Sequence, residues 1–243
     1  MATGNPKSSK TPSATSNAPI EHKYKEGYTH IAVLLDRSGS MESIRADIVG
    51  GFNTFLGEQQ QGEGEATLTL VQFDTGNPYE VLQDTQPIGL VPRLSTETFV
   101  PRGGTPLLDA MGRLIIDVEA KLARLKEKSR PEHVVLAIIT DGQENQSCEF
   151  NRQQVSGMLK KKEDDGWKIV FLSADLAAIN DAVADGVSFA RSMAFDKTAK
   201  GTFDAMGAFS EKVMALRKSI ASDIVFEEKD RAKQDIEKHR PLS

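Results

Sequence analysis

An apolar run at residues 31–35, Ile-Ala-Val-Leu-Leu, is followed at once by an Asp-x-Ser-x-Ser pattern. The run has the composition of a buried strand, and the pattern begins where such a strand turns over into a helix. Asp36, Ser38 and Ser40 thus lie at alternate positions, and hard oxygen ligands of this kind suit a small divalent cation such as Mg²⁺. The alternative interpretation is a turn rich in Asp and Ser that only caps a helix beginning near Ser43.

Two distant segments support the metal interpretation. In the Gly-Gly-Thr-Pro segment, Thr105 is predicted to be the N-cap of a helix, with Pro106 at the first helical position. The apolar run 134–139 predicts a second buried strand, closed by Thr-Asp-Gly, so Asp141 follows its strand as Asp36 follows the first. Loops at the carboxyl ends of neighbouring parallel strands converge. We therefore expect five oxygen-bearing residues to meet: Asp36, Ser38, Ser40, Thr105 and Asp141.

In this order, the three motifs resemble those of the von Willebrand factor type A domain, over roughly residues 28–217. In that family the five matching positions form the metal-ion-dependent adhesion site. The resemblance implies that the two serines bind Mg²⁺ directly, with Mn²⁺ as an alternative metal, and that both aspartates act through water. The stretches 141–145 and 166–172 are typical of intracellular bacterial and phage members of the family.

The function implied by the resemblance is protein–protein recognition, in which the metal receives a Glu or Asp carboxylate from a partner. Loop residues around the metal are expected to select that partner, although each of them taken singly is also explained as an ordinary exposed loop residue. This predicted rim consists of Arg37, Met41, Glu42, Arg102, Gln143, Glu144, Asn145 and Gln146.

The sequence leaves two other functional classes open. We do not expect an enzyme, because the four histidines fall in the tails or at strand starts and no Gly-x-Ser-x-Gly elbow occurs. A metal-assisted hydrolase remains an alternative, in which Glu42 or Glu144 would act as the base. The other alternative is an adaptor or subunit of a larger assembly, such as an AAA+ ATPase or a stress-response or phage system.

Hydrophobic periodicity alternates between strand and helix along the chain. The expected fold is α/β: a Rossmann-like, doubly wound, mostly parallel six-stranded sheet with one antiparallel edge strand and helices on both faces. The edge strand is predicted at residues 79–82. A closing helix is predicted at 202–219, with an apolar face for packing against the sheet made of Phe203, Met206, Phe209, Val213 and Leu216.

The predicted division of the chain is a disordered leader at 1–27, one domain at 28–220 and a charged C-terminal tail at 221–243. A net charge of −5 favours neither nucleic acid nor an anionic membrane as a partner. Cys148 is the single cysteine, so no intramolecular disulfide forms. Together with the absence of a long apolar run, this predicts a cytoplasmic protein.

Overall fold

The computed structural model describes Met1 and residues 23–234. Most of the predicted leader and the end of the predicted tail therefore lie outside the described residues. Strands and helices follow one another in the chain as β1 Lys25–Asp36, α1 Arg45–Gln61, β2 Glu65–Asp74, β3 Asn77–Pro87, α2 Leu107–Arg124, β4 Pro131–Thr140, α3 Arg152–Asp164, β5 Lys168–Ser173, α4 Leu176–Ala184, β6 Ser192–Ala194, α5 Ala199–Arg217 and α6 Glu228–Arg231.

One six-stranded sheet forms the centre of the molecule, in the order β3-β2-β1-β4-β5-β6. Neighbouring strands run parallel except for β2 and β3, which form an antiparallel pair at one edge. The predicted fold class is therefore confirmed. The chain adds β2 and β3 on one side of β1, and then β4, β5 and β6 on the other side. In doubly wound sheets, a binding site usually lies at the carboxyl ends of the strands where the order changes side in this way.

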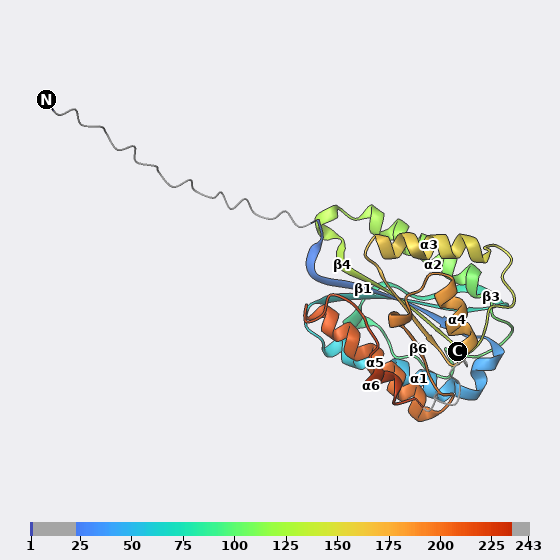
Figure 1. The fold of residues 1–243 in the computed structure, drawn as a ribbon. Coiled ribbons are helices and arrows are strands. Elements are labelled where there is room, and N and C mark those ends of the chain that lie inside the picture. Colours follow the sequence, from blue (N-terminus) through green and yellow to red (C-terminus); the bar gives the residue numbers. More distant parts are fainter. Residues whose placement is uncertain (2–22, 235–243) are drawn as a thin grey trace.

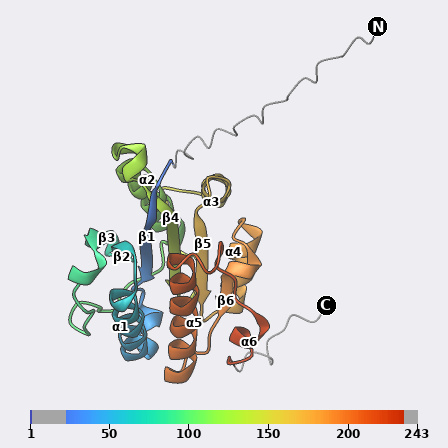
Figure 2. The ribbon, with the colours of Figure 1, turned by 90° about the vertical axis from the view of Figure 1, so that its left-hand side faces the viewer.

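Helices cover both faces of the sheet (Figures 1 and 2). In the orientation of Figure 1, α2 and α3 lie above the sheet, and α1 and α5 lie below it. Alternate residues of β1 enter the two cores: Ile31, Val33 and Leu35 pack with α1 and α5, whereas Ala32 and Leu34 pack with α2, α3 and α4. Burial on both faces explains why the run at 31–35 is apolar without alternation.

The packed domain extends beyond both predicted boundaries. Its first strand begins at Lys25, before the predicted start at residue 28. At the other end, Ile224 and Phe226 are buried in the core below the sheet, and the backbone N–H of Phe226 donates to the carbonyl of Ala190. The described part of the predicted charged tail therefore packs on the domain, because two apolar side chains within it reach the core.

The closing helix α5 differs from its prediction at one position. Met206, Phe209 and Leu216 are buried as expected, but Phe203 is 56% exposed. The helix begins at Ala199, and its opening turns direct Thr202 and Ala205 inward instead. At its other end, Arg217 donates to the carbonyl oxygens of residues 59, 62, 63 and 64, and so attaches α5 to the end of α1.

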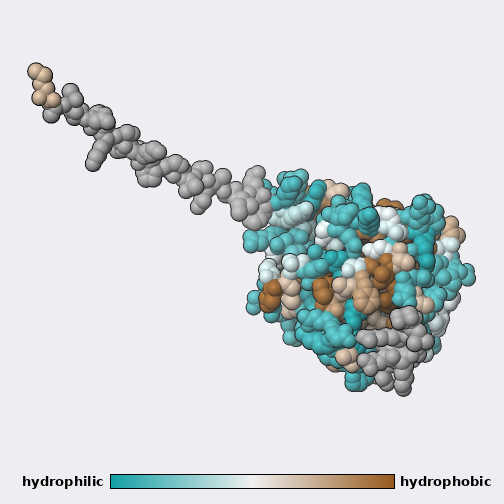
Figure 3. Space-filling model, in the orientation of Figure 1, coloured by the Kyte–Doolittle hydropathy of each residue, from teal (hydrophilic) through white to brown (hydrophobic). Residues whose placement is uncertain are grey.

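Polar residues cover most of the molecular face seen in Figure 3, and hydrophobic residues reach the surface in an area near its middle. Over the described range of the chain, no helix combines the length and the apolar character needed to span a bilayer.

A buried histidine predicts how stability depends on pH. His30 in β1 is 1% exposed, and its ring nitrogens contact the hydroxyls of Thr67 and Thr69 at 2.9 and 3.4 Å. Burial, followed by the charge of Lys121, lowers its pKa from 6.5 to about 4. Between these two values the unfolded chain binds a proton that the folded chain does not. The free energy of unfolding should therefore fall as the pH drops, by roughly 3 kcal/mol from this group.

Urea unfolding of the wild type and of His30→Leu between pH 7 and pH 4 measures this effect. The variant should lose less stability on acidification than the wild type. Two curves that run parallel over this range would show that His30 does not titrate differently in the folded and unfolded chains.

Candidate metal centre

Two parallel strands position the Asp36 carboxylate and the Thr140 hydroxyl that donates to it. β1 ends at Asp36 and the neighbouring β4 ends at Thr140, so their side chains meet at the carboxyl edge of the sheet. The Thr140 hydroxyl donates to Asp36 Oδ2 at 2.6 Å, and the Ser38 backbone N–H donates to Asp36 Oδ1 at 2.7 Å. The Asp36 carboxylate is therefore held in one orientation.

Hydroxyl groups link the two aspartate loops. Ser38 Oγ lies 3.1 Å from Ser40 Oγ, and Ser40 Oγ donates to Asp141 Oδ1 at 2.6 Å. Four of the predicted ligands thus form one continuous hydrogen-bonded chain, although Asp36 and Asp141 are separated by more than a hundred residues. The expected convergence of these loops is observed.

The loop that carries Thr105 is fastened to both of the others. Toward the first loop, the Gly39 N–H donates to the Gly103 carbonyl at 3.0 Å, and a Cβ on Gly39 would lie 3.3 Å from that oxygen. Toward the third loop, the Thr105 N–H donates to Asn145 Oδ1 and the Asn145 N–H donates to the Thr105 carbonyl. A side chain at position 39 would therefore make a tight contact with the Gly103 carbonyl, and one of the two loops would have to shift by a few tenths of an ångström.

The predicted capping role of Thr105 is wrong. Helix α2 begins at Leu107, its N-cap is Pro106, and no side chain of the N-cap residue contributes. Glu144 takes this role from another loop, because its Oε2 accepts from the Leu108 N–H at 2.9 Å. The Thr105 hydroxyl, on a residue that is 3% exposed, is consequently not used as a helix cap.

Of the two aspartates at the centre, Asp36 lacks a neighbouring positive charge among the described residues. Burial raises the pKa of Asp36 from 3.8 to about 6; hydrogen bonds from Thr140 and Ser38 oppose this, and the nearby charge of Asp141 adds to it. None of the ion pairs among residues 23–234 includes Asp36. Two carboxylates and three hydroxyls form a donor set that fits a hard divalent cation. Within the described residues, no group of three or more His, Cys, Asp or Glu side chains offers an alternative metal site.

Two predicted rim residues are not at the surface. Met41 is buried in the lower core, because the short 3-10 helix Gly39–Ile44 turns it inward. Arg37 is 5% exposed and points along the sheet toward Asp74 and Glu80, with which it forms ion pairs. Glu144 is half-buried. The remaining predicted rim residues are exposed: Glu42, Arg102, Gln143, Asn145 and Gln146.

The Glu144 carboxylate is fully engaged in organising the loop between β4 and α3. Besides capping α2, it accepts from the backbone N–H groups of Gln146 and Ser147. Asp109, in the first turn of α2, reciprocates by accepting from the N–H groups of residues 148, 149 and 150 at 2.8–2.9 Å. These contacts fix the loop that carries Asn145 and leave Glu144 poorly placed to act as a base.

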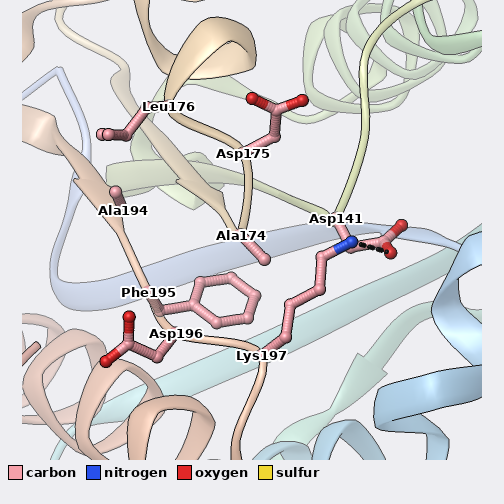
Figure 4. A pocket seen from close by; sticks show the side chains of 8 residues that line it. All are labelled: Asp141, Ala174, Asp175, Leu176, Ala194, Phe195, Asp196 and Lys197. Atoms are coloured by element: carbon pink, nitrogen blue, oxygen red, sulfur yellow. Dashed lines mark hydrogen bonds and ion pairs between the residues drawn. The ribbon is translucent and has the colours of Figure 1, made fainter. Parts of the chain in front are cut away.

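Sequence reasoning missed Lys197 as a site residue. Lys197 lies between β6 and α5, and its Nζ contacts Asp141 Oδ2 at 2.8 Å (Figure 4). No motif indicates this contact, because it joins residues 56 positions apart in the chain.

Replacing Asp109 tests whether the β4–α3 loop depends on its carboxylate. Asp109→Ala removes the acceptor of three backbone N–H groups and should lower the free energy of unfolding by about 2–4 kcal/mol. Glu149→Ala is the control, because it removes only an exposed ion pair with Arg113 and should cost less than about 1 kcal/mol. Urea unfolding of both variants measures the difference, and equal losses would contradict this role.

Comparison with known proteins supports the architecture. No protein-family model matches the sequence, and no curated protein does. Among solved structures, the fold is similar to the pilus adhesin SpaC of Lactobacillus rhamnosus GG in its open conformation, with a TM-score of 0.60 at 15% identity over 78% of this chain. A von Willebrand factor type A protein from Catenulispora acidiphila has a TM-score of 0.53 at 12% identity over 79% of this chain.

A third structure, proximal thread matrix protein 1 of the mussel byssus with a zinc-occupied MIDAS motif, has a TM-score of 0.51 at 17% identity over 79% of this chain. The matched regions span 30% of the SpaC chain, 43% of the Catenulispora chain and 46% of the mussel chain. The fold of this protein is that of a von Willebrand factor type A domain, and the predicted ligand loops lie together at the carboxyl edge of its sheet.

Proposed function

We propose that this chain is a divalent-metal-dependent module for protein–protein recognition. Its centre is a metal-ion-dependent adhesion site in which Asp36, Ser38, Ser40, Thr105 and Asp141 hold Mg²⁺, with Mn²⁺ as the alternative. When bound, the metal offers an open coordination position to an Asp or Glu carboxylate of a partner protein. The observation that carries the proposal is the hydrogen-bonded chain from Asp36 to Asp141, which assembles hard oxygen donors from separate segments.

The charges at the site support this donor set. Asp36 is buried with no counter-ion among the described residues, so a cation at the site would relieve the free-energy cost of keeping it ionised. The three hydroxyl groups are neutral and leave part of the metal's charge available to an external carboxylate. Zinc occupies the MIDAS motif of the mussel protein of similar fold, which is in keeping with a divalent ion here.

We propose recognition rather than catalysis because, within the described residues, the candidate bases Glu144, His30 and Glu42 are engaged or buried. The Glu144 carboxylate is engaged by backbone N–H groups, and His30 is buried within β1. Glu42 remains exposed, but it forms an ion pair with Arg45, one turn along the chain. A metal-assisted hydrolase would need a base beside metal-bound water.

The proposed partner is a protein with an exposed acidic residue. Arg102 is an exposed cation beside the Thr105 loop, with its Nε 3.1 Å from Asp74, and adds positive charge to the rim. We further propose that the protein acts in the cytoplasm and belongs to the bacterial and phage branch of this fold, on the basis of the stretches 141–145 and 166–172. As an adaptor, it would use the same metal to join a larger assembly.

A peptide library displayed on phage and panned against the full chain in Mg²⁺ tests partner recognition. Selected peptides should share an Asp or Glu whose amide counterpart does not bind, and EDTA should release them. Thr105→Ala should weaken binding by more than tenfold while lowering the free energy of unfolding by only about 1 kcal/mol or less, because the hydroxyl caps no helix.

Ser43→Ala is the matched control, since it removes an exposed hydroxyl close to the site that donates to the Ser40 carbonyl. Peptides that bind equally well in EDTA, or to the Thr105 variant, would place recognition elsewhere on the domain.

A further inference from the structure

Lys197 places a positive charge on one of the proposed metal ligands. Its Nζ lies 2.8 Å from Asp141 Oδ2, while the other carboxylate oxygen of Asp141 accepts from the Ser40 hydroxyl. Figure 4 shows the lysine side chain extending toward Asp141 at the side of a pocket of about 570 Å³, whose lining includes Asp141, Asp175, Phe195 and Lys197. Both oxygens of Asp141 are therefore occupied by donors from this chain.

The two members of this ion pair differ in their access to water. The Asp141 side chain is 0% exposed, whereas that of Lys197 is 44% exposed. A buried carboxylate gains much from a nearby cation, since water cannot screen it. A lysine on a flexible four-carbon stem, by contrast, returns to water with little loss of hydration. The contact thus stabilises Asp141 but is easily reversed from the lysine side.

We propose that Lys197 is a tethered cation that competes with the divalent metal for Asp141. The proposal rests on the proposed metal site. Without metal, the ammonium group supplies the positive charge that Asp141 requires; when a divalent ion binds, the ammonium group leaves Oδ2 for solvent. Lys197 thereby lowers the metal affinity, because each binding event must break the ion pair. The same competition makes the empty site more stable than two buried carboxylates alone would be.

Calorimetric titration of the full chain with MgCl₂ and MnCl₂ tests this proposal. Lys197→Met keeps most of the length of the side chain and removes its charge, and it should bind Mg²⁺ roughly tenfold more tightly than the wild type. Lys197→Arg keeps the charge and should bind like the wild type. The matched control is Lys200→Met: Lys200 is three residues away, 76% exposed, and paired with Asp204. Its affinity should equal that of the wild type.

Thermal unfolding adds a measurement that does not depend on a partner. In EDTA, Lys197→Met should melt below the wild type, because Asp141 loses its counter-ion. With saturating Mg²⁺, the two melting temperatures should converge, since the lysine no longer contacts Asp141 in either protein. Thermodynamic linkage requires two free-energy differences between Lys197→Met and the wild type to be equal: the loss in stability in EDTA and the gain in Mg²⁺ binding.

The outcomes separate this proposal from the one on which it rests. Metal binding by the wild type with unchanged or weaker binding by Lys197→Met overturns the competition and leaves the metal site standing. Binding by Lys197→Met alone supports the competition and shows that the lysine closes the site in the wild type. Failure of both proteins to bind Mg²⁺ or Mn²⁺ overturns both proposals.

Discussion

In EDTA, Asp36→Asn should melt at or above the temperature of the wild type, and Mg²⁺ should reverse this order. The Asp36 carboxylate is 0% exposed, and burial raises its pKa from 3.8 to about 6. At neutral pH without metal, the folded chain therefore carries a buried charge at a free-energy cost of up to about 3 kcal/mol. An amide avoids this cost, and the Thr140 hydroxyl has the Gly142 carbonyl as an alternative acceptor at 3.1 Å.

The same variant should lose the response to metal. Mg²⁺ at one hundred times its dissociation constant stabilises a folded protein by about 2.7 kcal/mol, and this gain should be absent without the carboxylate. The sign of the pH dependence follows from the raised pKa. In EDTA the wild type should gain stability from this group as the pH falls from about 6 to 3.8, because the folded chain takes up the proton first.

Differential scanning calorimetry of both proteins, in EDTA and in Mg²⁺, measures the reversal. Asp47→Asn is the control, since Asp47 lies in the first turn of α1 outside the ligand set and should leave the metal response unchanged. A wild type that melts at the same temperature in EDTA and in Mg²⁺ would contradict the metal site.

Asp74→Ala should be the most destabilising single change near the site, lowering the free energy of unfolding by about 3–5 kcal/mol. Asp74 ends β2 next to β1 and is 0% exposed; its Oδ2 accepts from Arg37 at 2.7 Å and from Arg102 at 3.1 Å. Burial alone would raise its pKa, but the Asn77 N–H and Arg37 outweigh this and lower it. Alanine would leave the buried Arg37 guanidinium with only the partly exposed Glu80 as its anionic partner.

This variant should also weaken metal binding, because Asp74 holds Arg37 of the Asp36 loop and Arg102 of the Thr105 loop. Arg102→Ala is the control: it removes the half-exposed partner and leaves the buried pair intact, so it should cost less than about 1 kcal/mol. Urea unfolding and Mg²⁺ titration measure the two effects. An Asp74→Ala protein as stable as Arg102→Ala would show that the buried pair contributes little.

Local signals in the sequence predicted the elements that carry the site. The apolar runs before Asp36 and Asp141 and the glycines before Thr105 indicated where strands end and loops begin. Parallel strands present their carboxyl ends at one edge, so the meeting of these loops also followed from the order of the elements. The α/β fold and the antiparallel edge pair β2–β3 were also predictable, because the order of strand and helix patterns along the chain indicates them.

Side-chain direction and pairing were decided only by the tertiary structure. Met41 and Arg37 stand in a polar loop motif, yet one faces the core and the other Asp74, because a 3-10 turn and the register of β1 against β2 orient them. The Lys197–Asp141 and Glu144–α2 contacts join segments distant in sequence. Periodicity indicates which residues lie on one face of a helix or strand. Contacts between distant segments depend instead on how the helices and strands pack against one another, and no local sequence pattern encodes that packing.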